Sequence, residues 1–133
     1  MSDVGYTTKF EGRLNLSRKL TNQETSQLST FTSGRHDDTD GVMPSIWCEW
    51  RLTSDRMGLE WTGHEKFNRY IEWLELIIEM CFDEFEVRVQ GKIAYLGDNG
   101  LKDIGTISVS NNKVTVEKGI VDMNTVTREA AKP

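Results

Sequence analysis

The stretch from Phe67 to Phe82 constrains the fold more than any other part of the sequence. Its apolar residues recur at spacings of three and four, which place them on one face of an α-helix. Thr62 and Glu65, just before it, have the spacing of a capping box, in which a hydroxyl and a carboxylate satisfy the first free amides of a helix. We therefore expect a long amphipathic helix that begins at Thr62 and packs across a sheet. Its apolar face comprises Phe67, Tyr70, Ile71, Trp73, Leu74, Leu76, Ile77, Ile78, Met80 and Cys81.

Alternation of apolar and polar residues predicts six strands. A second Thr-x-x-Glu pattern, from Thr21 to Glu24, predicts a short helix that ends near Thr32. The resulting order β-α-β-β-α-β-β-β predicts an α+β fold with an antiparallel or mixed sheet and two helices mainly on one face. Its first six elements match a ferredoxin-like core. One domain would span residues 1–117, followed by a loosely ordered C-terminal tail at 118–133. The predicted strands are Tyr6–Leu16, Ile46–Thr53, Leu59–Trp61, Phe85–Tyr95, Ile104–Val109 and Val114–Glu117.

Composition and charge argue against several functional classes. The formal net charge of −5 disfavours direct nucleic-acid binding, because phosphate contacts need clustered Lys and Arg. No apolar run approaches the roughly 20 residues of a membrane-spanning helix, and no signal peptide is recognisable, so we expect a cytoplasmic protein without membrane contact. Cys48 and Cys81 fall on predicted apolar faces, as reduced, buried thiols do. The Cys and His spacing matches no zinc site, and we predict neither a metal nor a cofactor.

Four residues define a first candidate site, at the predicted mouth of the long helix. The free amides and the macrodipole of a helix N-terminus favour anions. Lys66 would supply the counter-charge and Trp61 a stacking wall for a nucleotide-type ligand, with His64 and Arg35 nearby. The alternative is a plain helix cap with solvated His64 and Lys66. No catalytic residue is predicted, because no Ser, Cys or Asp is spaced to act with His64.

A second candidate site combines aromatic and charged residues. The strand predicted at 46–53 turns a Trp outward beside an Arg, which is typical of interface anchors. The alternative is that the second helix or the C-terminal hairpin covers this Trp. The long helix adds a strip of carboxylates, which is either a solvated face or a phosphate mimic that occupies the basic groove of a nucleic-acid-binding partner. The residues of this partner-binding site are Trp47, Glu49, Arg51, Glu72, Glu75 and Glu79.

Four short segments carry a pattern that extends over most of the chain. They are Pro-Ser-Ile-Trp-Cys-Glu-Trp at 44–50, Leu-Glu-Trp-Thr-Gly-His-Glu-Lys-Phe at 59–67, Tyr-Ile-Glu-Trp-Leu at 70–74 and Val-Gln-Gly-Lys-Ile at 89–93. In this pattern the chain resembles a group of small bacteriophage and prophage proteins. It departs from the group at Tyr95, where those proteins tend to have Trp. The resemblance implies a phage or prophage setting and no particular reaction.

The sequence therefore favours a non-enzymatic accessory protein that binds and modulates a host protein or protein complex. Inhibition of a nucleic-acid-targeting defence complex is one such role, and it agrees with the acidic balance and the outward aromatic residues. A protein that binds or sequesters a small nucleotide-type anion is the alternative, and an enzyme comes third. The C-terminal hairpin leaves a sheet edge that a second copy could cover, so a homo-oligomer is compatible with the sequence.

Overall fold

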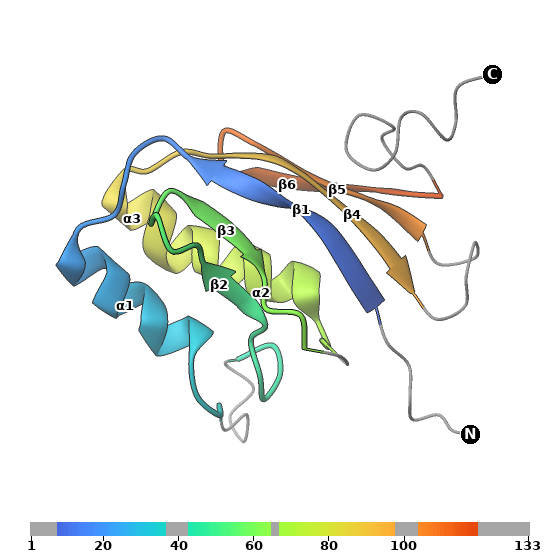
Figure 1. The fold of residues 1–133 in the computed structure, drawn as a ribbon, viewed down its shortest axis with the longest axis horizontal. Helices are drawn as coiled ribbons and strands as arrows, with labels where there is room; N and C mark the ends of the chain where they lie inside the picture. Colours follow the sequence, from blue (N-terminus) through green and yellow to red (C-terminus); the bar gives the residue numbers. More distant parts are fainter. Residues whose placement is uncertain (1–7, 37–42, 65–66, 98–103, 120–133) are drawn as a thin grey trace.

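A computed structural model describes the fold, and the residues that it places form six antiparallel strands and two helical segments (Figure 1). The described residues are 8–36, 43–64, 67–97 and 104–119. The α+β class predicted from the sequence is confirmed. In chain order the elements are β1 (Thr8–Leu16), α1 (Asn22–Thr32), β2 (Trp50–Leu52), β3 (Gly58–Trp61), α2 (Tyr70–Ile77), η2 (Ile78–Phe82), α3 (Asp83–Phe85), β4 (Val89–Gly97), β5 (Ile104–Ser110) and β6 (Lys113–Lys118).

β1 lies inside the sheet, whose strand order is β2-β3-β1-β4-β5-β6 (Figure 1). Its pairing with β4 runs without a break, from Thr8 opposite Gly97 to Leu16 opposite Val89. β3 pairs with β1 only near the end of β1, so the first half of β1 borders β4 alone among the described strands. The other two neighbours in the order, β4 with β5 and β5 with β6, pair over most of their length.

Alternation within the strands explains why one face of the sheet is buried. In β1 the side chains of Leu14 and Leu16 are buried, whereas that of the intervening Asn15 is exposed. Leu28 of α1 and Trp73 of α2 belong to the same apolar core as these strand residues, and α1 contacts η2. Both helices therefore cover the same face, and burial of this shared apolar surface is the main force that holds the layers together.

The long helix begins later than the sequence predicts. It starts at Tyr70 and not at Thr62, and its N-cap residue Arg69 has a left-handed φ of 58° and no side-chain cap. The helix then continues through η2, a wider π-type turn, and α3 to Phe85, since the residues at both joints keep right-handed helical angles. The predicted apolar stripe is buried or partly buried except at Met80, which is 51% exposed. No helix in the described segments combines the length and apolar character needed to cross a membrane.

Two predicted strands are shorter than expected. The strand predicted at Ile46–Thr53 is confined to Trp50–Leu52, and the strand predicted from Phe85 begins only at Val89. Phe85 instead closes the long helix, and the chain then turns through a left-handed residue. Most of the tail predicted at 118–133 lies outside the described residues.

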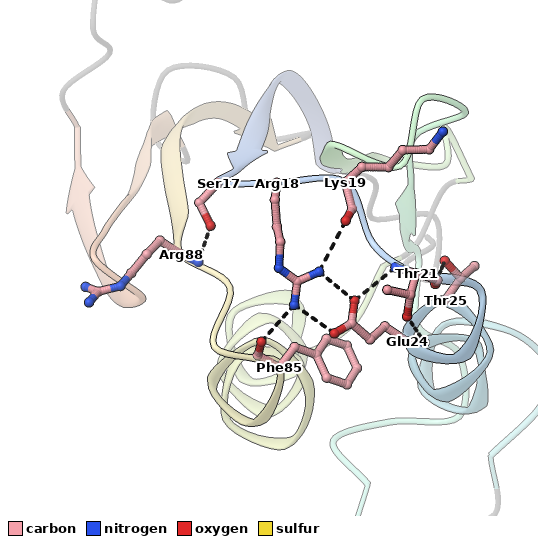
Figure 2. Close-up of polar contacts among 8 residues, drawn as sticks. All are labelled: Ser17, Arg18, Lys19, Thr21, Glu24, Thr25, Phe85 and Arg88. Atoms are coloured by element: carbon pink, nitrogen blue, oxygen red, sulfur yellow. Dashed lines mark hydrogen bonds and ion pairs between the residues drawn. The ribbon is translucent and has the colours of Figure 1, made fainter.

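The start of α1 is fixed by a network that the sequence predicts only in part (Figure 2). Thr21 Oγ1 accepts from the Glu24 backbone N–H at 3.1 Å, and the Glu24 carboxylate accepts from the Thr21 N–H at 2.9 Å, so this capping box is confirmed. The same carboxylate accepts two hydrogen bonds from Arg18, each 2.8 Å long, and Arg18 also donates to the Phe85 carbonyl at 2.9 Å. The bonds from Arg18 are the main reason that the pKa of Glu24 falls to about 2.

Candidate functional site

Glu49, Trp61, Thr62 and His64 meet at the end of the β2–β3 hairpin, and we call these four residues the β3 corner. The Thr62 N–H donates to the Glu49 carbonyl at 2.9 Å, which extends the hairpin by one residue on each side. Glu49 Oε1 accepts from Thr62 Oγ1 at 2.8 Å and lies 3.0 Å from His64 Nδ1. The Trp61 indole N–H donates to the His64 carbonyl at 3.0 Å. The corner is therefore closed by its own side chains.

This geometry overturns the capping box predicted at Thr62. Its hydroxyl donates to Glu49 and accepts from the backbone N–H of His64, two residues on, at 3.2 Å. That pattern is a local side-chain turn, which competes with helix formation. The helix itself begins at Tyr70, and Lys66 lies outside the described residues. The anion site predicted at a helix mouth therefore loses the helix terminus on which it depended.

The β3 corner pairs a sheltered carboxylate with an exposed imidazole. The side chain of Glu49 is 14% exposed, whereas that of His64 is 76% exposed. A carboxylate that orients a histidine through Nδ1 also occurs in catalytic triads. Within the described part of the chain, however, no hydroxyl or thiol is hydrogen-bonded to the His64 ring. The arrangement thus resembles two members of a triad without the nucleophile, and its visible effect is to fix the chain after β3.

Trp47 precedes β2 and is held at the N-terminal end of α2 through Ser45. Ser45 Oγ accepts a 2.8 Å hydrogen bond from the indole of Trp73, a residue that is fully buried. The same hydroxyl lies 3.3 Å from the Trp47 carbonyl and 3.1 Å from the Asn68 carbonyl, and it can donate to one of them at a time. Despite this anchoring of its backbone, Trp47 is 52% exposed.

The polar face of the helix formed by α2 and η2 carries the three predicted carboxylates. Glu72, Glu75 and Glu79 are all exposed. Arg69 pairs with Glu72 at 3.2 Å, and no ion pair in the described segments engages Glu75 or Glu79. We call Trp47 together with these three glutamates the Trp47 surface. It groups an exposed aromatic residue, whose backbone is tied to the N-terminal end of α2 through Ser45, with a strip of negative charge on the same helix.

The structure places the remaining predicted site residues elsewhere. Arg51 forms an ion pair with Glu60 across the β2–β3 hairpin at 2.9 Å. Glu49 is engaged in the β3 corner. The predicted partner-binding residues therefore fall into two groups: Trp47 with the three helix glutamates, and Glu49 with Arg51 at the hairpin. Arg35 follows α1, is exposed, and has no hydrogen bond or ion pair to any described residue. No contact brings Arg35 to Trp61 or His64.

A cavity of about 360 Å³ opens where β1 and β3 diverge. Trp61 forms one wall of it, and its other described lining residues come from β1, β4 and the start of β5. Apolar side chains dominate, with one cation and one anion among them. His64 and Arg35 are not among the lining residues, so the predicted ligand set is not gathered here. The other described lining residues are Lys9, Phe10, Glu11, Ala94, Tyr95, Leu96 and Ile104.

Cys48 and Cys81 are buried, free thiols, as predicted. Burial raises the pKa of Cys48 to about 12 and that of Cys81 to about 11. Both thiols therefore stay protonated near neutral pH, where only the thiolate is a good nucleophile. No group of three or more His, Cys, Asp or Glu side chains in the described segments is arranged to hold a metal ion.

Sequence reasoning missed two residues that position the candidate sites. Ser45 acts through Trp73, which is 28 residues away in the chain, and Thr62 acts through Glu49, which is 13 residues away. Neither spacing corresponds to a local motif, so no pattern in the sequence could have revealed these contacts. Pairing of the β2 and β3 segments, which the sequence does predict, is the only available hint for Thr62 and Glu49.

Comparison of the chain with protein-family models, with curated proteins and with solved structures finds no match. A function for this chain therefore has to be argued from its own residues.

Proposed function

We propose that this chain is a small non-enzymatic phage or prophage accessory protein that binds and modulates a host protein in the host cytoplasm through the Trp47 surface. The observation that carries the proposal is the 52% exposure of Trp47 on a backbone that Ser45 ties to α2. A large aromatic side chain exposed on a fixed backbone is suited to bury itself in a partner.

Anchoring matters because binding costs conformational entropy. A side chain on a loose loop must be ordered when the complex forms, whereas an anchored one is partly ordered beforehand. Trp is also among the residues that most often dominate the binding energy of an interface, because it fills a pocket and excludes water around it. Trp47 combines both properties.

The charge of the Trp47 surface suggests the chemistry of the partner. Glu72, Glu75 and Glu79 present negative charge along one helical face, and the whole chain has a net charge of −5. Such a surface attracts a basic patch and accelerates encounter with it. A groove that normally holds nucleic acid has this character, so inhibition of a nucleic-acid-targeting defence complex is the role that we favour.

A capture experiment tests this proposal. The tagged full-length chain is used as bait in a bacterial host lysate, beside Trp47→Ala and a triple Glu72→Gln, Glu75→Gln, Glu79→Gln variant. Met57→Ala is the matched control, since Met57 is 40% exposed and lies in the turn at the other end of the β2–β3 hairpin. We expect one stoichiometric partner with the wild type and the control, and much less of it with the other two variants. A partner retained equally by all four baits would contradict the proposal.

The cavity beside Trp61 supports a second candidate function, the binding of a small flat ligand such as a nucleobase. Its volume of about 360 Å³ lies within the range of ligand pockets, and an apolar lining with few polar groups is typical of them. Thermal unfolding in the presence of a panel of nucleosides and nucleotides tests this. We expect a stabilising compound with the wild type and none with Ala94→Leu, which fills the cavity, whereas no stabilisation of the wild type would exclude this function for the panel.

We also propose that β1 to β4, with their helices, form a ferredoxin-like core to which β5 and β6 are added. The element order β-α-β-β-α-β and the antiparallel order β2-β3-β1-β4 support this. In that arrangement Trp47 precedes the strand β2, which forms the edge of the sheet opposite the added hairpin.

A further inference from the structure

β6 forms one edge of the sheet. Among the described strands it pairs only with β5, so half of its peptide groups have no strand beside them. Val114 and Val116 lie opposite Val109 and Ile107, on the helix-covered face, and are only partly buried. Lys113, Thr115 and Glu117 alternate with them on the open face. An edge of this length is a ready template for pairing with another strand.

The ladder shows which peptide groups face the open edge. The Gly119 N–H donates to the Ile104 carbonyl at 2.5 Å, so this opposed pair is a hydrogen-bonded one. Hydrogen-bonded and non-bonded pairs alternate along an antiparallel ladder. The peptide groups of Lys113, Thr115 and Glu117 therefore point to β5, and those of Val114 and Val116 point away from it.

We propose that β6 pairs with β6 of a second copy of this chain, antiparallel, about a two-fold axis at Thr115. In this register Val114 of each copy lies opposite Val116 of the other, and the peptide groups that point outward on both strands can bond to each other. On the open face Lys113 of each copy lies opposite Glu117 of the other. The sequence Lys-Val-Thr-Val-Glu at 113–117 is thus complementary to itself.

The charges, and the alternation of side chains between the two faces of the sheet, favour this register over registers shifted by one or two residues. Facing residues of an antiparallel pair share a face, so a slip by one residue would place one valine opposite Thr115 and the other opposite Lys113 or Glu117 of the open face. A slip by two residues keeps the faces matched but removes both pairs between Lys113 and Glu117. These pairs would be non-hydrogen-bonded pairs, in which cross-strand side chains come closest.

The dimer would leave the Trp47 surface free. β2 is at the opposite edge of the sheet from β6, so two copies joined at β6 would carry their β2 strands at the two outer ends. A partner with two equivalent sites, or a repetitive one, would then be bound with avidity. The alternative is that residues 120–133 of the same chain pair with this edge. The chain would then be a monomer.

The mass of the full chain in solution, measured by light scattering after size-exclusion chromatography at several concentrations, tests the proposal. We expect a dimer for the wild type, dissociation of Lys113→Glu and of Glu117→Lys, and a restored dimer when both changes are combined. Glu75→Lys alters the charge to the same extent on another surface and should remain dimeric. Circular dichroism confirms that each variant is folded, and the double variant shows that neither change blocks folding.

Two results would overturn the proposal. A wild-type chain that is monomeric at every concentration would show that β6 does not pair with a second copy. A dimer that persists unchanged in both single variants would show that the two copies meet through another surface or another register.

Discussion

The β3 corner and the Trp47 surface both combine a tryptophan with charged residues, yet they use these groups in opposite ways. In the β3 corner the indole of Trp61 donates to the His64 carbonyl, and Glu49 accepts from Thr62 and His64. On the Trp47 surface the indole is half exposed, and Glu75 and Glu79 have no ion pair within the described residues. The polar groups of the β3 corner are hydrogen-bonded to one another, whereas those of the Trp47 surface remain available to a partner.

This difference separates structural polar groups from functional ones. A carboxylate that is engaged inside the molecule contributes to the free energy of unfolding, whereas an exposed one contributes little to it and remains free to bind. Substitutions in the β3 corner should therefore change stability and leave partner binding intact. Substitutions of the Trp47 side chain should do the reverse.

Ser45→Ala should give the largest loss of stability, because it removes the hydrogen-bond acceptor of the buried Trp73 indole. An unpaired buried donor costs about 1–3 kcal/mol, and we expect about 2 kcal/mol in urea unfolding. The Trp47 loop would also lose its anchor, so capture of the partner should weaken. In a Trp73→Phe background the same change should cost much less, since no indole N–H remains to be satisfied. An equal cost in both backgrounds would show that the hydrogen bond is not the cause.

Glu49→Ala should cost about 1–2 kcal/mol, because Thr62 and His64 both lose the oxygen that they share. His64→Ala is the matched control and should cost less than about 0.5 kcal/mol, since its side chain is 76% exposed. Urea unfolding measures both changes. Neither variant should alter partner capture, and a loss of capture with Glu49→Ala at full stability would move the binding site to the β3 corner.

Glu24 provides a pH-dependent reference away from both regions. Its pKa is lowered from 4.5 to about 2 by the hydrogen bonds from Arg18. The ionised carboxylate is favoured in the folded state, so this contribution is present above pH 4.5 and is lost as the pH falls toward 2. After allowance for solvent screening we expect it to be under about 1 kcal/mol. Unfolding measured between pH 5 and 2 should show a shallower decline for Glu24→Gln than for the wild type. An identical decline would mean that other carboxylates account for it.

Two Thr-x-x-Glu patterns show how far the sequence determines local structure. At Thr21 the hydroxyl and Glu24 complete a capping box, and the helix begins as predicted. At Thr62 the hydroxyl bonds to Glu49, a partner from the neighbouring strand, and the helix begins eight residues later. A local motif specifies a helix start only where no tertiary partner competes for its groups.

The candidate site could be predicted only in part, again because some of its contacts are made by partners distant in the sequence. Helical spacing correctly placed Glu72, Glu75 and Glu79 on an exposed face, because the apolar stripe opposite them fixes the orientation of the helix. Strand alternation predicted the outward direction of Trp47 correctly but placed the residue in a strand, whereas the strand starts at Trp50 and the preceding loop is held by Ser45. Its exposure was one of two alternatives that the sequence left open, and the position of its backbone at the N-terminal end of α2 depends on contacts distant in the sequence.

The most direct test of the claim that Trp47 anchors partner binding is the affinity with which the captured partner binds the Trp47→Ala variant. The partner would be purified and titrated calorimetrically against the wild type, Trp47→Ala and Met57→Ala. We predict that Trp47→Ala binds at least roughly tenfold more weakly, as expected of an interface anchor, while its thermal unfolding midpoint stays close to that of the wild type. Unchanged affinity of Trp47→Ala would contradict the account, as would a loss of affinity that is fully explained by unfolding of the variant.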